Sequence, residues 1–451
     1  MTLPPPSYND NPKSFAYPTV HKRWPAILTS AIEDVSDYSK RNPGTEQCAE
    51  YVTEKLQGLL KEFKQDKQVR AFTKEEIAIK PELEEYNEEL EKFNKQKVVT
   101  WLTGPWLYLE CYFYQLIDVW FKQTKKLKDF DVFEAGKTKA FKQSGAGVVE
   151  LCHRFKLLSE QLAQKSTDST TLKLLFTEFI DISLWGNATD LSLLAGTTTL
   201  EDIKSLQGAE VRKKNEEKIL VNDTEKAWEH LMGTARDRVD IVLDNSGFEL
   251  FADLCLSLFL LDAKVVNRVV LHCKRIPWFV SDTMPKDFDL LLAQLGDEHF
   301  FDDASGDSSG SEAIGYLLKK VKQYHQNGTI STQSHPFWTS YANYWDIPKV
   351  KDLYEELGKS NLIIFKGDLN YRKLTGDLNW DTTTPFTEAI QDLASSRLPV
   401  LSLRTCKADV VVGLPKGVNE KLIEEYKKMG NEVGEFWTAS GKWAVISFSR
   451  G

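Results

Sequence analysis

The sequence predicts an α/β fold: a three-layer α/β/α domain with a mostly parallel sheet, preceded by an all-helical N-terminal domain. Three observations support this prediction. Apolar residues recur at helical spacing up to about residue 165, and short β-branched runs alternate with helical stretches after about residue 172. A polar break, Lys165–Thr171, separates the two patterns. Strands that alternate with helices are typical of parallel βαβ units, whose sheet is covered on both faces.

The first part of the chain predicts helices. Residues 1–17 form a Pro-rich, polar tail without periodicity, and the helical domain spans residues 18–165. Within this domain, three stripes of apolar residues at spacings of three and four each predict an amphipathic helix. The stripes are Val52, Leu56, Leu59, Leu60 and Phe63; Leu83, Tyr86, Leu90 and Phe93; and Leu151, Phe155, Leu158 and Leu162. The charged stretch Lys61–Lys97 is interpreted as solvated helix faces, with a partner-binding coil as the alternative.

The α/β/α domain, residues 172–451, contains the predicted strands. These are Val239–Leu243, Val269–His272, Trp278–Val280, Leu362–Phe365, Leu398–Leu403 and Ala444–Phe448. Pro399 is tolerated because it stands at the beginning of its strand. The segment Asp302–Glu312 is acidic and rich in small residues. It is interpreted as a flexible surface loop rather than a calcium loop, because the EF-hand spacing is absent.

Composition and charge exclude several classes of function. The chain has 451 residues, with 57 Lys and Arg against 66 Asp and Glu, a net charge of −9. Nucleic acid and anionic membrane surfaces are therefore poor partners. The most apolar stretches, Tyr108–Phe121 and Phe251–Leu261, are too short to span a bilayer and predict buried helices. The start of the chain has no apolar signal segment, so we expect a cytoplasmic protein, with the nucleus as a second possible compartment.

Polar residues follow four of the predicted strands. Asp244 and Asn245 follow the first, and Asp282 follows the Trp278–Val280 run. The segments Lys366–Lys373 and Arg404–Lys407 follow the next two strands. One such strand end alone is typical of a turn or a helix cap. Because ligands bind outside the carboxyl ends of parallel strands, which share one edge of the sheet, four of them predict a common site.

The residues at the first two strand ends predict a metal site. Asp244, Asn245 and Asp282 offer oxygen donors, which suit hard or borderline divalent cations such as Mg²⁺ or Mn²⁺. Two carboxylates neutralise such an ion, and the amide oxygen adds a ligand without further charge. Zinc is less expected, because the sequence contains no HExxH motif and no Cys/His cluster.

The residues at the other two strand ends predict a phosphate site. Arg372, Lys373, Arg404 and Lys407 are cationic, and guanidinium and ammonium groups bind phosphate oxygens. A metal facing cations across a small gap suits a phosphate ester. The sequence has neither the P-loop of common NTPases nor the GxSxG motif of serine hydrolases. The glycine-rich turn Ser144–Gly147 is interpreted as an ordinary helix start.

Five motifs occur in the order of a known family. They are Leu184–Leu191 (LWGNATDL), Val239–Leu250 (VDIVLDNSGFEL), Ile276–Thr283 (IPWFVSDT), Phe365–Leu374 (FKGDLNYRKL) and Leu403–Lys407 (LRTCK). With these motifs the chain resembles the damage-control phosphatases, formerly the domain of unknown function 89 family. The likeness is to the stand-alone eukaryotic subclass with an Arg-Thr-x-Lys signature.

The resemblance implies both a fold and an activity. It implies an α/β/α catalytic domain behind a helical N-terminal domain. It also implies a divalent metal, with Mn²⁺, Co²⁺ or Ni²⁺ favoured, on Asp244, Asn245 and Asp282. Substrate contacts would come from the segment Asp368–Arg372 and from Lys407. The implied activity is a phosphatase of metabolite damage control acting on sugar phosphates, notably fructose 1-phosphate.

The leading hypothesis is therefore a metal-dependent phosphomonoester hydrolase, with Asp244, Asp282 and Asp368 as its catalytic residues. Water activated by the metal would attack phosphorus. Asp368 and Asn370 would orient the water or the sugar hydroxyls. The residues expected to contact the substrate are Asp244, Asn245, Asp368, Leu369, Asn370, Tyr371, Arg372, Arg404 and Lys407.

Three alternatives stand beside this hypothesis. An aspartyl-phosphate route through Asp244 ranks below water attack, because the DxDx[TV] pattern is absent. An S-adenosylmethionine-dependent protein-glutamate O-methyltransferase would need a strand–Gly-loop–helix unit, which the sequence lacks. A non-catalytic interaction protein would use the helices of Lys61–Lys97 as its binding surface.

Overall fold

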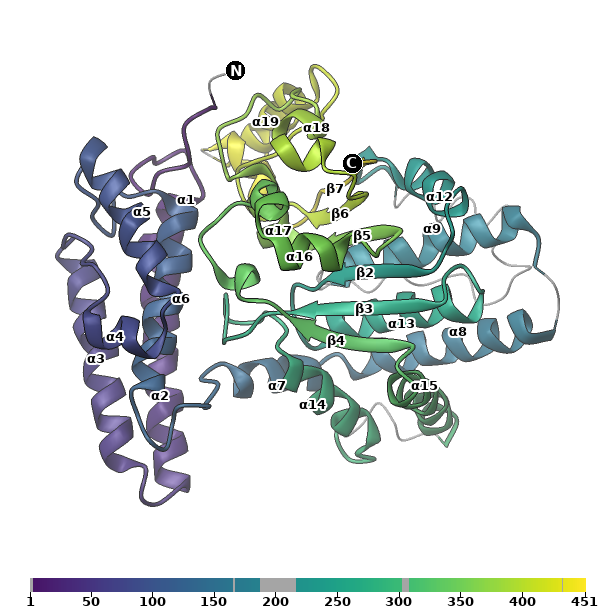
Figure 1. The fold of residues 1–451 in the computed structure, drawn as a ribbon, viewed down its shortest axis with the longest axis horizontal. Coiled ribbons are helices and arrows are strands. Elements are labelled where there is room, and N and C mark those ends of the chain that lie inside the picture. Colours follow the sequence, from purple (N-terminus) through teal and green to yellow (C-terminus); the bar gives the residue numbers. More distant parts are fainter. Residues whose placement is uncertain (1–2, 165–166, 187–215, 302–307, 432) are drawn as a thin grey trace.

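Figure 1 shows the fold in the computed structural model, which describes residues 3–164, 167–186, 216–301, 308–431 and 433–451. A bundle of N-terminal helices lies beside a larger part in which helices flank a seven-stranded sheet. The predicted fold class, an α/β/α arrangement with a mostly parallel sheet preceded by helices, is confirmed.

The helical part has one core. Its helices are α1 (Ala16–Pro18), a π-helical turn (Thr19–Arg23), α2 (Trp24–Arg41), α3 (Glu46–Lys64), α4 (Lys74–Ile79), α5 (Leu83–Gln96) and α6 (Trp106–Lys122). Every residue of α6 from Trp106 to Phe121 is buried, so α6 is the central helix of this part. The buried helix predicted at Tyr108–Phe121 is thereby confirmed. Among the described residues, no helix is long and apolar enough to cross a membrane.

The three predicted apolar stripes lie on helices α3, α5 and α8. Leu56 of α3 and Leu90 of α5 are buried in the core of the helical part. Leu158 of α8 is buried in a different core, which also contains Ile241 and Leu271 of the sheet. The domain limits at residues 165 and 172 stay a prediction.

Further helices follow in the remainder of the chain. They are α7 (Glu134–Lys142), α8 (Gly145–Gln164), α9 (Ser169–Trp185), α12 (Thr224–Met232), α13 (Phe248–Asp262), α14 (Pro285–Gly296), α15 (Ser308–Gln326), α16 (Lys351–Leu357), α17 (Gly367–Thr375), α18 (Phe386–Ala389) and α19 (Val418–Lys428). Four short 3₁₀ helices lie at Pro336–Thr339, Tyr344–Lys349, Gln391–Ser395 and Gly434–Ala439. Asp168, in the predicted polar break, caps α9 by accepting a hydrogen bond from the backbone N–H of Thr171.

The sheet has the strand order β1-β7-β6-β5-β2-β3-β4. Its strands are β1 (Ile219–Asn222), β2 (Arg238–Val242), β3 (Arg268–Cys273), β4 (Ile330–Ser334), β5 (Leu362–Lys366), β6 (Val400–Thr405) and β7 (Ala444–Ser449). Strands β6, β5, β2, β3 and β4 are parallel to one another. β7 is antiparallel to β6, and β1 is parallel to β7.

Alternate residues of the central strands enter two different cores. Ile241 and Leu271 pack with α8, α9, α13 and α15 on one face of the sheet. Val242 and Phe365 pack with α16 to α19 on the other face. Both faces are therefore covered, which explains why the central strands are buried on both faces and do not alternate apolar with solvent-exposed residues.

One strand prediction in this region is wrong, and two strands of the sheet were not predicted. Trp278–Val280 is a turn rather than a strand, because Phe279 and Val280 have φ angles of 44° and 72°. Their apolar character has another cause: Trp278 and Phe279 pack on Tyr114 of α6, with ring centroids 5.8 Å and 4.9 Å away. Strands β1 and β4 were not expected. The residues of β4 are mostly polar (ISTQS), whereas β1 is a short apolar run (ILVN) that the sequence prediction did not include.

Parts of two predicted segments lie outside the described residues. In the motif Leu184–Leu191 these are residues 187–191, and in the predicted acidic loop they are residues 302–307. The remainder of that loop, Ser308–Glu312, begins helix α15 instead. Leu317, two turns further on, is buried against the sheet, and this packing supports a helix where composition indicates a loop.

Candidate functional site

Four strand ends meet at one edge of the sheet, as the sequence predicts. β6, β5, β2 and β3 are neighbouring parallel strands, so their carboxyl ends lie side by side. This edge faces the helical part. Trp278, Leu369 and Ala408, which follow β3, β5 and β6, are all buried in the core of the helical part.

Asp244 and Asp282 come together through backbone pairing. Asn245 and Asp282 form an isolated antiparallel bridge. The N–H of Thr283 donates to the carbonyl of Asp244 over 2.8 Å, and the N–H of Ser246 donates to that of Ser281 over 2.8 Å. The turn at residues 279–281 thus places Asp282 beside the end of β2, although no strand precedes it directly.

Both carboxylates are buried, with 5% and 2% of the Asp244 and Asp282 surfaces exposed. Burial, followed by repulsion from Glu249 and Asp282, raises the pKa of Asp244 well above its ordinary value. Burial also raises the pKa of Asp282 to about 7, against the opposing attraction of Lys274. Burial and mutual repulsion therefore disfavour the charged forms of both carboxyl groups when no cation is bound.

Glu249 is a third carboxylate at this point, and sequence reasoning missed it. It lies in the first turn of α13, four residues after Asn245. The amide nitrogen of Asn245 donates to Asp244 Oδ2 over 2.9 Å and to Glu249 Oε2 over 2.8 Å, while Ser281 donates to the amide oxygen. The spacing of four residues between Asn245 and Glu249 could have indicated from sequence that their side chains lie close together.

Two fully buried lysines support the carboxylates. Sequence reasoning missed Lys274, and it named Lys366 only as the first residue of a strand-end segment, without a role. Lys274 donates to the carbonyl of Leu243 over 2.8 Å and lies 3.4 Å from Asp282 Oδ2. Lys366 contacts Glu249 over 3.0 Å and Asp253 over 2.8 Å. Burial opposes the charge of Lys366, but these two carboxylates outweigh it and raise its pKa.

Asp368 and Lys407 lie on the cationic side of the site. Asp368, in the first turn of α17, accepts hydrogen bonds from Arg404 Nε over 2.8 Å and from the backbone N–H of Lys407 over 2.9 Å. The positive charge of Lys407 lowers the pKa of Asp244, acting against its burial. Lys407 therefore stands close enough to the carboxylates for their charges to interact.

Arg404 lies beneath the site. Its guanidinium is fully buried, and besides Asp368 it donates to the carbonyls of Ala408, over 2.9 Å, and Val410. It also stacks on the ring of Tyr371 at 4.4 Å. All three nitrogens of Arg404 thus bind the protein itself.

The other expected contacts in α17 also bind the protein. Asn370 donates to the carbonyls of Val242 and Lys366, over 3.1 Å and 2.7 Å. The hydroxyl of Tyr371 accepts from the N–H of Val412 over 3.0 Å. Leu369 is buried in the core of the helical part.

The two remaining cations of α17 hold neighbouring segments. Arg372 pairs with Glu110 over 2.9 Å and with Asp377 over 3.0 Å. Lys373 donates to the carbonyl of Ser340 over 2.7 Å. Of the expected contacts in α17, Asp368 accepts hydrogen bonds from the Arg404–Lys407 segment, and Tyr371 stacks on Arg404.

The donor set fits a divalent cation. No group of three His, Cys, Asp or Glu side chains in the described part of the chain has the geometry of a metal site. Two carboxylates and an amide are nevertheless adjacent. Within the described residues the buried Oδ2 of Asp282 has the Lys274 ammonium 3.4 Å away but accepts no closer hydrogen bond. A cation would satisfy this atom and offset the mutual repulsion of Asp244, Asp282 and Glu249.

A model of the damage-control phosphatase ARMT1-like domain matches residues 19–422 of this chain. The chain belongs to this family. "Damage-control phosphatase ARMT1" of Danio rerio is 34% identical over 458 residues, covering 97% of this chain and 95% of the relative. The protein of that name from Xenopus tropicalis is 35% identical over 457 residues, covering 97% and 96%. The Homo sapiens protein is 33% identical over 452 residues, covering 96% of each chain.

A solved structure is also similar to this chain. It is the crystal structure of a DUF89 family protein from Pyrococcus horikoshii, with 14% sequence identity and a TM-score of 0.34. The match covers 83% of this chain and 90% of that one. Membership of the ARMT1-like damage-control phosphatase family confirms the predicted resemblance and supports a phosphatase activity.

Proposed function

We propose that this ARMT1-like chain is a metal-dependent phosphatase that hydrolyses sugar phosphates, among them fructose 1-phosphate. One observation carries the proposal: buried carboxylates and Lys407 meet at the carboxyl edge of the sheet, within a family of phosphatases. A phosphate ester needs both a cation for its oxygens and carboxylates to hold that cation.

Asp244, Asp282 and the amide of Asn245 would hold the divalent metal, Mn²⁺, Co²⁺, Ni²⁺ or Mg²⁺. When bound, such an ion polarises a phosphoryl oxygen and makes water more acidic. Lys274 lies 3.4 Å from Asp282 Oδ2 and favours its ionised form, which is the form that binds a cation.

Lys407 would bind the phosphoryl oxygens opposite the carboxylates. Its ammonium group offers three donors, and the contact of its backbone N–H with Asp368 sets the position of its segment. Arg404 acts indirectly in this proposal, because its guanidinium holds the loop that carries Lys407. Arg404 and the N–H of Lys407 both donate to Oδ1 of Asp368. The other carboxylate oxygen, Oδ2, would orient water or a sugar hydroxyl.

The test measures phosphate release from fructose 1-phosphate with each of the four metals, against a panel of other sugar phosphates. We expect Asp244→Ala to lower kcat by at least about a hundred-fold. Asp237→Ala is the matched control, because Asp237 is exposed at the opposite end of β2. An Asp244→Ala variant that keeps the wild-type rate, or a wild-type chain that releases no phosphate with any metal, would refute the proposal.

A further inference from the structure

The segment before α1 lies between the two parts of the molecule. Pro6 pairs with Leu378 and Tyr8 pairs with Pro105 in isolated bridges. The N–H of Asn9 donates to the carbonyl of Gly104 over 3.0 Å. Residues 5–15, which we name the N-terminal strap, therefore contact both the helical part and the loops after α17.

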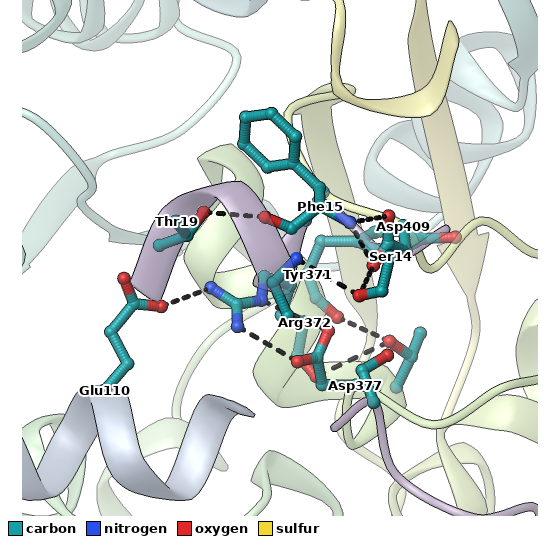
Figure 2. Close-up of polar contacts among 12 residues, drawn as sticks. Ser14, Phe15, Thr19, Glu110, Tyr371, Arg372, Asp377 and Asp409 are labelled. Carbon is teal, nitrogen blue, oxygen red and sulfur yellow. Dashed lines mark hydrogen bonds and ion pairs between the residues drawn. The ribbon is translucent and has the colours of Figure 1, made fainter. Parts of the chain in front are cut away.

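The strap ends at the carboxylate of Asp409. Figure 2 shows the side chain of Ser14 and the backbone nitrogen of Phe15 facing this side chain. The Ser14 hydroxyl donates to Asp409 Oδ2 over 2.5 Å, and the N–H of Phe15 donates to Oδ1 over 2.8 Å. The ring of Phe15 packs edge-on against Trp106, whose own ring lies 3.8 Å from the Arg372 guanidinium.

Asp409 belongs to the loop that carries Lys407. This loop, residues 406–412, follows β6 and is held from inside by Arg404 and by Tyr371, whose hydroxyl accepts from the N–H of Val412. Asp368 holds the N–H of Lys407. These contacts all come from β6 and α17. Asp409 adds an attachment from a different part of the chain, two residues after Lys407.

We propose that Asp409, held by Ser14 and Phe15 of the N-terminal strap, is a positioning residue that sets the place of Lys407 for the phosphoryl group. The inference rests on the proposed function and names a second determinant of that same site. The strap is thereby part of the substrate-binding apparatus, although its described hydrogen bonds reach Asp409 and not Asp244, Asp282 or Glu249.

The chemistry of the contact supports a positioning role over simple packing. Burial raises the pKa of Asp409 to about 6, although Ser14 and Phe15 both favour its ionised form. The half-buried carboxylate of Asp409 holds its neighbours by directed hydrogen bonds, which an apolar side chain could not provide. A displacement of about 1 Å at a reacting group can cost about a hundred-fold in rate.

The kinetic test compares three variants with sugar phosphate as substrate. Asp409→Ala removes the hydrogen bonds that the Asp409 side chain accepts from Ser14 and Phe15. We expect KM to rise about ten-fold, with a smaller fall in kcat. Asp409→Asn keeps an oxygen that can accept from the N–H of Phe15, so it should restore KM to within about three-fold of the wild type. Asp262→Ala is the matched control: it removes a carboxylate that binds Ser159 and Tyr324 in another part of the fold and should leave KM unchanged.

A second measurement does not depend on turnover. The affinity for inorganic phosphate, measured by calorimetry, should fall about ten-fold in Asp409→Ala and stay at the wild-type value in Asp262→Ala. Hydrogen exchange at the amides of Lys407 and Val412 should become faster in Asp409→Ala alone. Unchanged phosphate affinity in Asp409→Ala, or a wild-type chain that binds no inorganic phosphate, would overturn the positioning role. If the wild-type chain binds phosphate but hydrolyses no substrate, the proposed function is wrong. The phosphate affinities of the Asp409 and Asp262 variants still show whether Asp409 positions Lys407.

Discussion

The carboxylate of Asp244 occupies the space that a side chain on Gly367 would need. A Cβ atom at Gly367 would lie 2.7 Å from the Cβ of Asp244 and would overlap its carboxylate. Gly367 also has a φ of +80°, in the left-handed region that favours glycine. The end of β2 and the beginning of α17 therefore approach each other closely, and this approach brings the first turn of α17, which carries Asp368, next to Asp244.

Gly367→Ala should disrupt the site. The left-handed backbone costs about 1 kcal/mol for alanine, and the overlap with Asp244 adds about 1–3 kcal/mol. Gly417→Ala is the control, because Gly417 has a φ of +91° with no described atom within 4 Å of the added Cβ. Urea unfolding should show a larger loss of stability for Gly367→Ala, and Mn²⁺ binding should weaken in that variant alone. Equal losses would show that backbone strain, and not the overlap, decides.

Asp244→Asn should abolish phosphatase activity and increase the free energy of unfolding. The pKa of Asp244 is raised, so its charged form destabilises the fold at neutral pH, and the amide removes this cost. Without divalent cations we expect the variant to be about 1–2 kcal/mol more stable than the wild type, with its phosphatase activity lost. Added Mn²⁺ should raise the melting temperature of the wild type but not of the variant. A variant that is less stable in the absence of metal would contradict the electrostatic argument.

Arg404 and Lys407 should respond differently to substitution. Arg404→Lys loses the planar fork that holds the loop, so stability should fall by about 2 kcal/mol together with the activity. Lys407→Met should raise KM about ten-fold or more while the free energy of unfolding stays within about 0.5 kcal/mol. Steady-state kinetics and urea unfolding of both variants separate the two roles. If Arg404→Lys raised KM at unchanged stability, Arg404 would contact substrate directly.

Glu110→Gln should weaken the attachment of the helical part. Glu110 of α6 pairs with Arg372, and both side chains are buried (Figure 2). Removing one charge of a buried pair costs about 3–5 kcal/mol, and the remaining pair with Asp377 should reduce this to about 2–3 kcal/mol. Urea unfolding provides the measurement. Glu89→Gln, on the exposed surface pair with Lys92, is the control and should change stability by less than about 0.5 kcal/mol.

Lys373 should make stability depend on alkaline pH. Burial, with repulsion from Lys274 and Arg372, lowers the pKa of Lys373 to about 8, whereas the unfolded chain keeps its ordinary value near 10.5. Its contribution to stability is therefore present above about pH 10.5 and is lost as the pH falls through 8. Between pH 7 and 10 the wild type should gain up to about 3 kcal/mol relative to Lys373→Met, which does not titrate. A constant difference in urea unfolding across this range would contradict the shifted pKa.

The meeting of Asp244, Asp282 and Lys407 was predictable from sequence. Parallel strands share one carboxyl edge, so polar residues after several strands must lie near one another. Asp282 lies at the predicted edge, although the strand expected directly before it is absent. Its preceding run is a turn that packs on Tyr114, and the bridge to Asn245 places Asp282 at the edge.

The roles of Asn370, Tyr371 and Arg372 were not predictable in the same way. The segment after β5 is helix α17 from its first residue, and successive side chains on a helix point about 100° apart. Asp368 faces the Lys407 loop, while the next residues turn into the protein. The supporting Lys274 was missed because a cation beside a strand end gives no sign in sequence of being buried.

The contact between Ser14 and Asp409 joins residues that are 395 positions apart in the chain. At about 5–20 residues per second, a ribosome needs roughly 20–80 seconds to proceed from the first to the second. During that interval Ser14 has been synthesised, but Asp409, to which it later donates a hydrogen bond, has not. The attachment of the Lys407 loop to the strap is therefore completed late in biosynthesis, after most of the sheet has been translated, and a truncated nascent chain would lack it.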